Sequence, residues 1–250
     1  MFKATLLPFL LILTTTLSAQ TARNYRPGIG FITFGTLITG YGVSNELKTI
    51  PWPKPLTEEE LLKAEIEGVQ PNFFGIDKLP ETPRWNMKDQ HLSDKILNAS
   101  LAGELIFTIA QGPNGDFVPI MAQLESILAT YGLTKLVKPL IHRKRPYTHH
   151  NRAPLEERTA YNARLSMWSA HTAAAFASGA ATYQVFLMRN PNIEFGGKAA
   201  AGASILAIPT TAAILRITGG NHHITDVIVG ALVGSAIGIL VPKLHRVNFQ

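Results

Sequence analysis

A histidine and an aspartate stand four residues apart near the C-terminus, in the segment LRITGGNHHITDVIVG. If both lie on one helix, the carboxylate of Asp226 sits over the imidazole of His222 and can accept its Nδ1–H. That hydrogen bond leaves Nε2 unprotonated and available as a nucleophile. Gly219 and Gly220 give the backbone freedom to bring Arg216 to the same point. The cluster indicates nucleophilic attack by His222 on an anionic group that Arg216 helps to bind.

The same segment offers three potential metal ligands, His222, His223 and Asp226. Imidazole and carboxylate groups are common ligands of zinc, so a metal site is the alternative interpretation. Successive residues of a helix point about 100° apart, however, and adjacent histidines rarely bind one ion together. We therefore expect no metal at this cluster.

Two cations occur earlier, in the segment KPLIHRKRP, where Lys138 and Arg145 are seven residues apart. At this spacing the two side chains can approach one anion from different directions, and the planar guanidinium can bind two phosphate oxygens. The residues between them include His142, Arg143 and Lys144, so a solvated basic face is the alternative interpretation.

A third polar cluster, SMWSAHTAAAF, has the features of a helix start. We expect Ser169 to be the N-cap, so that the free backbone N–H groups beside Ala170 and the positive end of the helix dipole form an anion site. His171 would lie in the first turn, where it can pass a proton to a leaving oxygen. The alternative is structural, a capping serine followed by a half-buried histidine.

These clusters interrupt long apolar segments with helical spacing, whereas alternating strand patterns are scarce. We therefore expect an all-α protein built around a helix bundle. Gly230, Gly234 and Gly238 recur every fourth residue and predict a helix that packs closely against its neighbour. The expected helices cover residues 96–109, 117–137, 169–188, 198–215 and 226–241.

The first 19 residues combine Lys3, a short apolar run and small residues up to Ala19, which is the pattern of a secretory signal peptide. The apolar run is shorter than the roughly 20 residues that a transmembrane helix needs. We expect export to the bacterial periplasm. Residues 20–94 should form an irregular covering region without catalytic groups, apart from a short helix that begins after Thr57, and residues 95–250 should form the bundle.

The 250-residue chain has a net charge of +6 and no cysteine, which excludes disulfides and thiol catalysis. Positive charge suits an anionic substrate or an anionic lipid surface, and no nucleic-acid-binding motif occurs. The apolar stretches 172–188, 199–215 and 227–241 contain no charged residue, but each is short for a membrane span. We expect a bundle that is soluble or associated with a membrane.

The three clusters together resemble the type 2 phosphatidic acid phosphatases, which are related to bacterial non-specific acid phosphatases and vanadium haloperoxidases. The family pattern is K-x6-R-P, then P-S-G-H, then S-R-x5-H-x3-D. Residues 138–146 fit the first part, and Arg216, His222 and Asp226 fit the third at the correct spacing. The resemblance covers residues 96–244, and three parts in the right order are more specific than any one of them.

The resemblance implies a metal-independent phosphatase in which His222 attacks phosphorus, Asp226 orients it and His171 protonates the leaving group. It also implies that the phosphate is bound by side chains and by one backbone N–H, with vanadate as an inhibitor and not a cofactor. The implied phosphate-binding residues are Lys138, Arg145, Ser169, Ala170 and Arg216.

The chain departs from the family pattern at Trp168, Ala170 and Leu215, which replace a proline, a glycine and a serine. None of these changes removes an essential charge or the nucleophile. The expected function is therefore a phosphatase that hydrolyses a phosphomonoester, a lipid phosphate or a lipid pyrophosphate through a phospho-histidine intermediate. Two alternatives remain open: a vanadium-dependent peroxidase on the same cradle, and a non-catalytic bundle that binds an anionic lipid headgroup.

Overall fold

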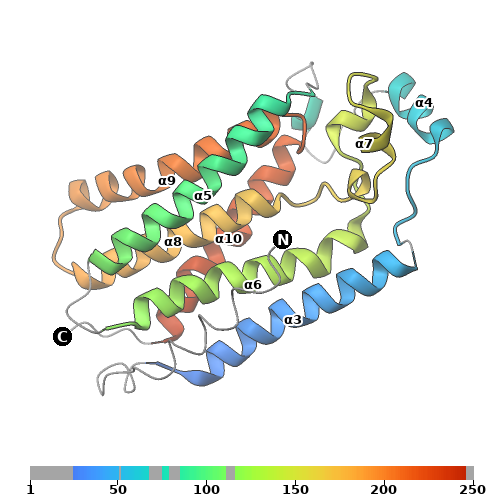
Figure 1. Cartoon of the computed structure of the whole chain (residues 1–250). Helices are drawn as coiled ribbons and strands as arrows, with labels where there is room; N and C mark the ends of the chain where they lie inside the picture. The colour runs from blue at the N-terminus through green and yellow to red at the C-terminus, as the bar shows by residue number, and fades with distance from the viewer. Residues whose placement is uncertain (1–24, 51, 68–74, 79–84, 111–115, 246–250) are drawn as a thin grey trace.

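The computed structural model describes residues 25–50, 52–67, 75–78, 85–110 and 116–245. The signal peptide expected at residues 1–19 lies outside these described residues. Over the described ranges the chain is helical and contains no β-strand, which confirms the all-α prediction. Long helices run along one another to form an elongated bundle, and short helices gather at one end of it (Figure 1).

Helix α8 (Ala170–Arg189) is the central helix, and it packs against α5 (Met87–Ala110), α6 (Val118–Ile141), α9 (Phe195–Thr218) and α10 (Ile224–Leu244). Its buried side chains are mostly alanine, serine and threonine. Small side chains let four neighbours approach one helix closely, which explains the alanine-rich sequence after Ser169.

The glycine strip of α10 faces α8, as the sequence predicts. A Cβ atom added at Gly234 would lie 2.1 Å from the carbonyl oxygen of Ala173, and one at Gly238 would lie 2.3 Å from that of Ala177. Both contacts are shorter than any real Cβ contact, so only glycine permits this approach. Nearer the start of α10, a Cβ at Gly230 would lie 2.8 Å from the carbonyl oxygen of Ser169, so the close contact also holds this end of α10 beside the start of α8.

The region before the bundle is more regular than the sequence suggested, because α3 (Pro27–Thr49) is a long helix that packs along α6. The two helices cross where a Cβ at Gly40 would lie 2.1 Å from the carbonyl oxygen of Gly132. Glycine-rich sequences have low intrinsic helix propensity, so tertiary packing stabilises this helix. Helix α5 likewise begins at Met87, so the expected boundary at residue 94 falls inside a helix.

A buried polar cluster joins three helices at the end of the bundle where α3 begins. Glu125 of α6 accepts a hydrogen bond from the Tyr25 hydroxyl at 2.6 Å and lies 2.8 Å from Nε2 of His245, which follows α10. The Tyr25 and His245 rings stack with their centroids 4.9 Å apart. Both oxygens of the buried Glu125 carboxylate therefore have partners inside the bundle. An unpaired charge at this position of an apolar helix would cost a large desolvation free energy.

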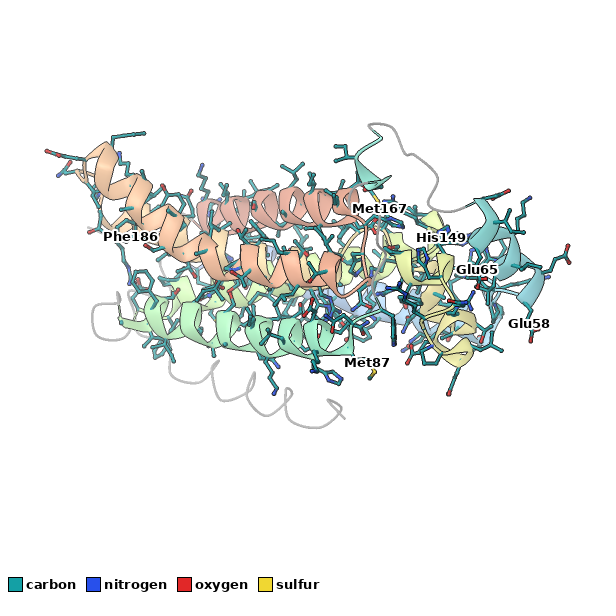
Figure 2. All side chains as sticks on the ribbon, turned by 90° about the horizontal axis from the view of Figure 1, so that it is seen from above. Glu58, Glu65, Met87, His149, Met167 and Phe186 are labelled. Atoms are coloured by element: carbon teal, nitrogen blue, oxygen red, sulfur yellow. The ribbon has the colours of Figure 1, made fainter. Side chains whose placement is uncertain are left out.

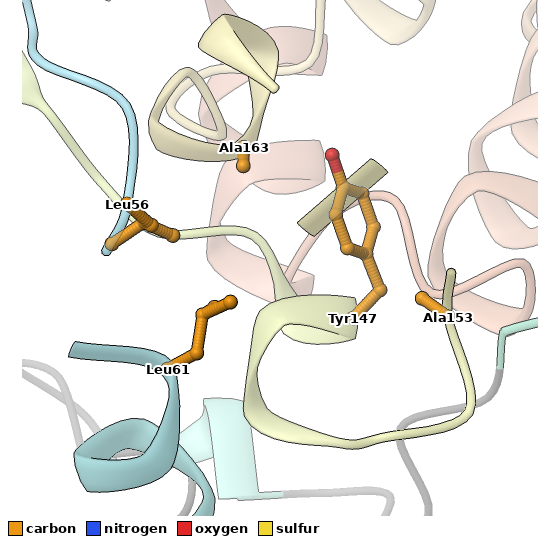
Figure 3. Packing of buried hydrophobic residues seen from close by; sticks show 5 residues of the cluster. All are labelled: Leu56, Leu61, Tyr147, Ala153 and Ala163. Carbon is orange, nitrogen blue, oxygen red and sulfur yellow. The ribbon is translucent and has the colours of Figure 1, made fainter. Parts of the chain in front are cut away.

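At the other end, the connection between α6 and α8 carries η2 (Pro146–His149), α7 (Leu155–Thr159) and η3 (Tyr161–Arg164), and α4 (Glu58–Glu67) covers it. Figure 3 shows the small apolar cluster between these segments, formed by Leu56, Leu61, Tyr147, Ala153 and Ala163. At the start of α4 the Thr57 backbone N–H donates to Glu60 Oε2 at 3.0 Å, and the Glu60 backbone N–H donates to the Thr57 hydroxyl at 3.2 Å, so the predicted capping box is present.

Two helices, α9 and α10, are long and apolar enough to cross a membrane by length and composition, with mean hydropathies of 1.5 and 2.2. Only 22% and 33% of their most apolar windows are buried inside the protein. Figure 2 shows many of their side chains pointing away from the bundle. Exposed apolar residues on these faces include Ile208, Ile214, Ile228, Leu232 and Leu240.

Candidate active site

A pocket of about 160 Å³ opens between α3, α6, the connection around η3, and the start of α8. Residues from all three polar clusters of the sequence line it. Three of them are cations from separate segments, namely Lys138 near the end of α6, Arg145 before η2 and Arg216 in the last turn of α9. Ala170, His171 and His222 also line the pocket, so the structure brings six of the eight predicted site residues to one cavity.

The ammonium group of Lys138 is buried and donates a hydrogen bond to the carbonyl oxygen of Leu165 at 3.0 Å. Burial lowers the pKa of this lysine well below its usual value, and the nearby charge of Arg145 adds to the effect. An anion bound in the pocket would raise the pKa of Lys138, because a nearby negative charge favours the protonated ammonium group. Arg145 is fixed by the carbonyl oxygens of Asn162 at 2.9 Å and Asn221 at 3.2 Å.

The guanidinium of Arg216 is held between a carboxylate and an imidazole. Its Nη1 lies 3.0 Å from Oδ1 of Asp94 on α5, and its Nη2 lies 3.0 Å from Nδ1 of His171. The same Asp94 oxygen lies 3.0 Å from Nε2 of His171. Burial lowers the pKa of His171; Asp94 partly opposes this shift, whereas Arg216 and Lys138 add to it.

His222 is buried and stands before α10, since His223 is the N-cap of this helix. The expectation that His222 and Asp226 both lie on a helix was therefore wrong. Only Asp226 does, and its Oδ2 is 3.6 Å from Nδ1 of His222, beyond hydrogen-bond distance. Within the described chain His222 Nδ1 has no hydrogen-bond partner. Burial lowers the pKa of His222 well below its usual value, so the ring is neutral at pH 7, as a nucleophile requires.

Both oxygens of Asp226 are bound by other groups. Oδ2 accepts hydrogen bonds from the Ser166 hydroxyl at 2.5 Å and from the His223 backbone N–H at 2.9 Å. Oδ1 lies 2.5 Å from Nη1 of Arg143. Burial alone would raise the pKa of Asp226, but His222, Arg143 and His223 lower it, so the carboxylate is ionised.

The second nitrogen of Arg143 binds Asp77, a residue of η1 (Ile76–Lys78). Asp77 also accepts hydrogen bonds from Thr225, from its backbone N–H at 2.9 Å and from its hydroxyl at 2.7 Å. The guanidinium therefore links a segment of the N-terminal region to the first turn of α10. A buried ion pair of this kind fixes the position of both carboxylates.

Comparison with models of known protein families assigns this helix bundle to a superfamily. A family model described as the PAP2 superfamily matches residues 119–250. The chain belongs to the PAP2 superfamily. Neither the curated proteins nor the solved structures contain a significant match to it. Members of the PAP2 superfamily are generally phosphatases, and they act on phosphorylated substrates.

The segment Trp168–Ala170 departs from the PAP2 motif at Trp168 and Ala170 and matches it at Ser169, and all three residues lie at the start of α8. Trp168, in place of proline, donates a hydrogen bond from its indole to the Thr134 hydroxyl on α6 at 2.7 Å. Ser169 caps α8, accepting from the Thr172 backbone N–H at 3.3 Å and from the Thr172 hydroxyl at 2.9 Å. Ser169 does not line the pocket, whereas the neighbouring Ala170 does.

Sequence reasoning missed Asp94, Asp77 and Arg143. The two aspartates belong to the region in which the sequence indicates no chemistry, and Arg143 entered the sequence analysis only through the alternative of a solvated basic face. The PAP2 motifs include none of the three, and no local pattern marks them. Their contacts span 66 to 122 residues of sequence, so they become visible only in the folded chain.

No three histidine, aspartate or glutamate side chains gather as a metal site in the ranges that the structure describes. Asp226 binds Ser166 and Arg143 instead of facing an ion between His222 and His223. The expectation that the reaction requires no metal stays a prediction.

Proposed function

We propose that this chain is a metal-independent phosphatase that hydrolyses a phosphomonoester through a phospho-histidine intermediate on His222. The observation that carries the proposal is the pocket itself. A neutral imidazole and three cations from different segments converge on it, and no aspartate or glutamate of the described chain lines it. Such a cavity matches a phosphoryl group, whose equatorial oxygens carry negative charge throughout the reaction.

In the first step, Nε2 of His222 forms a bond to phosphorus while the bond between phosphorus and the ester oxygen breaks. Lys138, Arg145 and Arg216 bind the phosphoryl oxygens, and the Ala170 backbone N–H at the start of α8 adds a further donor. The departing oxygen takes the electron pair of the broken bond and a proton from protonated His171.

In the second step, a water oxygen bonds to phosphorus and the nitrogen–phosphorus electron pair returns to His222. The neutral His171 accepts a proton from this water, so both histidines end in their starting states. Asp226 faces the opposite ring nitrogen of His222 and stabilises its positive charge while the intermediate exists. Inorganic phosphate and an alcohol are the products, and vanadate is expected to inhibit by occupying the phosphoryl site.

The apolar outer faces of α9 and α10 support association with a membrane, where a lipid phosphate would be the substrate. A phosphorylated small molecule would use the same cradle. Export to a bacterial periplasm is part of the proposal and rests on the sequence of the first 19 residues alone.

The proposal is tested with the full chain in detergent micelles, using p-nitrophenyl phosphate and a lipid phosphate, with and without EDTA and vanadate. We expect turnover that resists EDTA, is blocked by vanadate and disappears in His222→Ala. His150→Ala is the matched control, because this histidine does not line the pocket. A base-stable, acid-labile phosphoprotein from radiolabelled substrate would identify the intermediate.

A folded His222→Ala protein with undiminished turnover would contradict the proposed nucleophile. Halide oxidation by the wild type with added vanadate would favour the peroxidase alternative. Binding of anionic lipid without any turnover would favour the non-catalytic one.

A further inference from the structure

A buried carboxylate on α5 has no counter-charge. Glu104 is 6% exposed, and in the part of the chain that the structure describes it forms no ion pair with a lysine, an arginine or a histidine. It does not line the active-site pocket and has no role in the reaction described above. An isolated negative charge is expensive to bury, so this carboxylate must bind a proton or a cation in the folded protein.

Neutral side chains from three helices surround the Glu104 carboxylate. Its Oε1 accepts a 2.7 Å hydrogen bond from the Ser100 hydroxyl, one turn earlier on α5, and the Ser178 hydroxyl of α8 also hydrogen-bonds the carboxylate. Gln123 of α6 donates from Nε2 to the Ser178 oxygen at 2.9 Å. All four side chains are buried. The helices α5, α6 and α8 therefore meet at one polar cluster inside the bundle.

Two acceptor oxygens in this cluster have no donor within the described chain. They are Oε2 of Glu104 and Oε1 of Gln123, and both are buried. The Ser178 hydroxyl has one proton, which it gives to the carboxylate, so it can only accept from the Gln123 amide nitrogen. This leaves the amide oxygen of Gln123 as the free end. Because both groups contact the same hydroxyl, their two remaining oxygens lie in one small region, which attracts a positively charged ligand.

The chemistry of the cluster selects the kind of ligand. Carboxylate, amide and hydroxyl oxygens suit hard cations. The cluster contains a single carboxylate, so a divalent ion would leave a surplus positive charge buried, whereas a monovalent ion is neutralised. A proton meets the same condition. Burial raises the pKa of Glu104 to about 7, so above neutral pH the carboxyl releases its proton and a cation can replace it.

The cluster lies directly beneath the surface of the bundle. Gly103 and Ile106, which flank Glu104 on α5, are exposed, and nothing lies within 4 Å of a Cβ atom added at Gly103. On the inner side, a Cβ at Gly179 of α8 would lie 3.2 Å from Glu104 Oε1, so the α8 backbone approaches the carboxylate closely. An ion therefore has to pass only the α5 layer to reach the two oxygens.

We propose that α5, α6 and α8 form a buried binding site for one monovalent cation, held by Glu104 Oε2 and Gln123 Oε1 with the Ser100 and Ser178 hydroxyls beside it. The cation takes the place of the Glu104 proton and joins α5 to α6 and α8. It stabilises the bundle whenever Glu104 is ionised. The site is separate from the active-site pocket and does not depend on the proposed phosphatase activity.

Thermal unfolding of the full chain in detergent micelles tests the site, at pH 8 and pH 5, in about 150 mM NaCl, KCl or choline chloride. Choline is too large for the cluster, so it matches the ionic strength and gives the pH dependence of the cation-free protein. At pH 8 we expect Tm to be about 3 °C or more higher in NaCl or KCl than in choline chloride, and the more effective ion identifies the ligand. At pH 5 the proton occupies Glu104, so the three salts should give equal Tm values.

Glu104→Gln removes the charge with little change in volume and should give equal Tm values in the three salts at pH 8. Glu58→Gln, which changes an exposed carboxylate on α4, is the control and should keep the difference. Equal Tm values for the wild type at pH 8 would overturn the proposal, and so would a salt dependence that persists at pH 5 or in Glu104→Gln. The comparison of the two pH values needs no variant, so it holds even if Glu104→Gln does not fold.

Discussion

Arg143 Nη1 lies 2.5 Å from Asp226 Oδ1, so the carboxylate behind the proposed nucleophile is shared between an imidazole and a guanidinium. The nearest Asp226 oxygen is 3.6 Å from His222 Nδ1, and other donors occupy both carboxylate oxygens. Asp226 therefore acts on His222 mainly through its charge, and its position depends on Arg143 and Ser166. This arrangement makes Arg143 a positioning residue that does not line the pocket.

The first prediction concerns Arg143→Gln. We expect kcat to fall about tenfold or more with KM changed less than about twofold, because the cavity that binds substrate is untouched while Asp226 loses its anchor. The protein should also lose stability, since the buried carboxylates of Asp77 and Asp226 both lose their ion pair with the guanidinium.

The double variant Arg143→Gln/Asp77→Asn separates the two effects. Removing both charges should restore much of the thermal stability but not kcat. If kcat recovers together with stability, Arg143 has only a structural role.

The second prediction concerns pH. His171 must be protonated to donate to an alkoxide, and its pKa is lowered from about 6.5 by burial and by Arg216 and Lys138, against Asp94. Hydrolysis of a lipid phosphate, whose leaving group is an alkoxide, should therefore increase as pH falls from 8 towards 6. Asp94→Asn removes the carboxylate that favours the protonated form of His171, so the pKa of His171 should fall further. The pH at which this variant is most active should therefore be lower than that of the wild type.

The pH profile of kcat/KM checks this prediction, with Asp89→Asn on the same helix as the control. An unchanged profile in Asp94→Asn would show that His171 does not supply the proton.

The third prediction concerns Glu104, a buried residue of α5 whose Oε1 accepts a 2.7 Å hydrogen bond from Ser100. Burial raises its pKa to about 7. The unfolded chain releases this proton near pH 4.5, so stability should decrease as pH rises from 4.5 to 7 and level off above, a loss of about 3 kcal/mol.

Glu104→Gln should remove this decrease and raise Tm at pH 8 relative to the wild type. Tm values at pH 5 and pH 8 measure the effect, and the exposed Glu58→Gln is the control. A wild type and a Glu104→Gln protein with parallel pH dependence would contradict the prediction.

The fourth prediction tests the contact between α10 and α8. Gly234→Ala places a Cβ where only 2.1 Å separates it from a backbone oxygen, so α10 must move away. We expect a loss of about 3 kcal/mol in the free energy of unfolding and lower activity, because α10 carries Asp226 and α8 begins beside His171.

Gly35→Ala, on α3, is the matched control. Nothing lies within 4 Å of the added atom, and alanine should stabilise the helix by about 1 kcal/mol. An equal loss of stability in Gly35→Ala, where nothing touches the added atom, would show that the loss in Gly234→Ala does not come from the contact with α8.

The sequence by itself determined the helix bundle, the positions of its main helices and most of the residues that line the pocket. Apolar periodicity identifies the helix faces that must be buried. The spacing within the motifs of Lys138, Arg145, Arg216 and His222 is likewise a local feature, so it can be recognised in the sequence without the structure. The glycine strip of α10 was readable for the same reason, since its four-residue repeat describes one face of one helix.

The tertiary structure decided the contacts between segments far apart in the chain. No local pattern indicates that Asp94 contacts Arg216 or that Asp77 binds Arg143, because ion pairs across 122 and 66 residues depend on how the helices pack. It also decided that His222 precedes α10, since the capping of that helix by His223 sets its first residue. Local spacing specifies which groups are available, and packing specifies which of them meet.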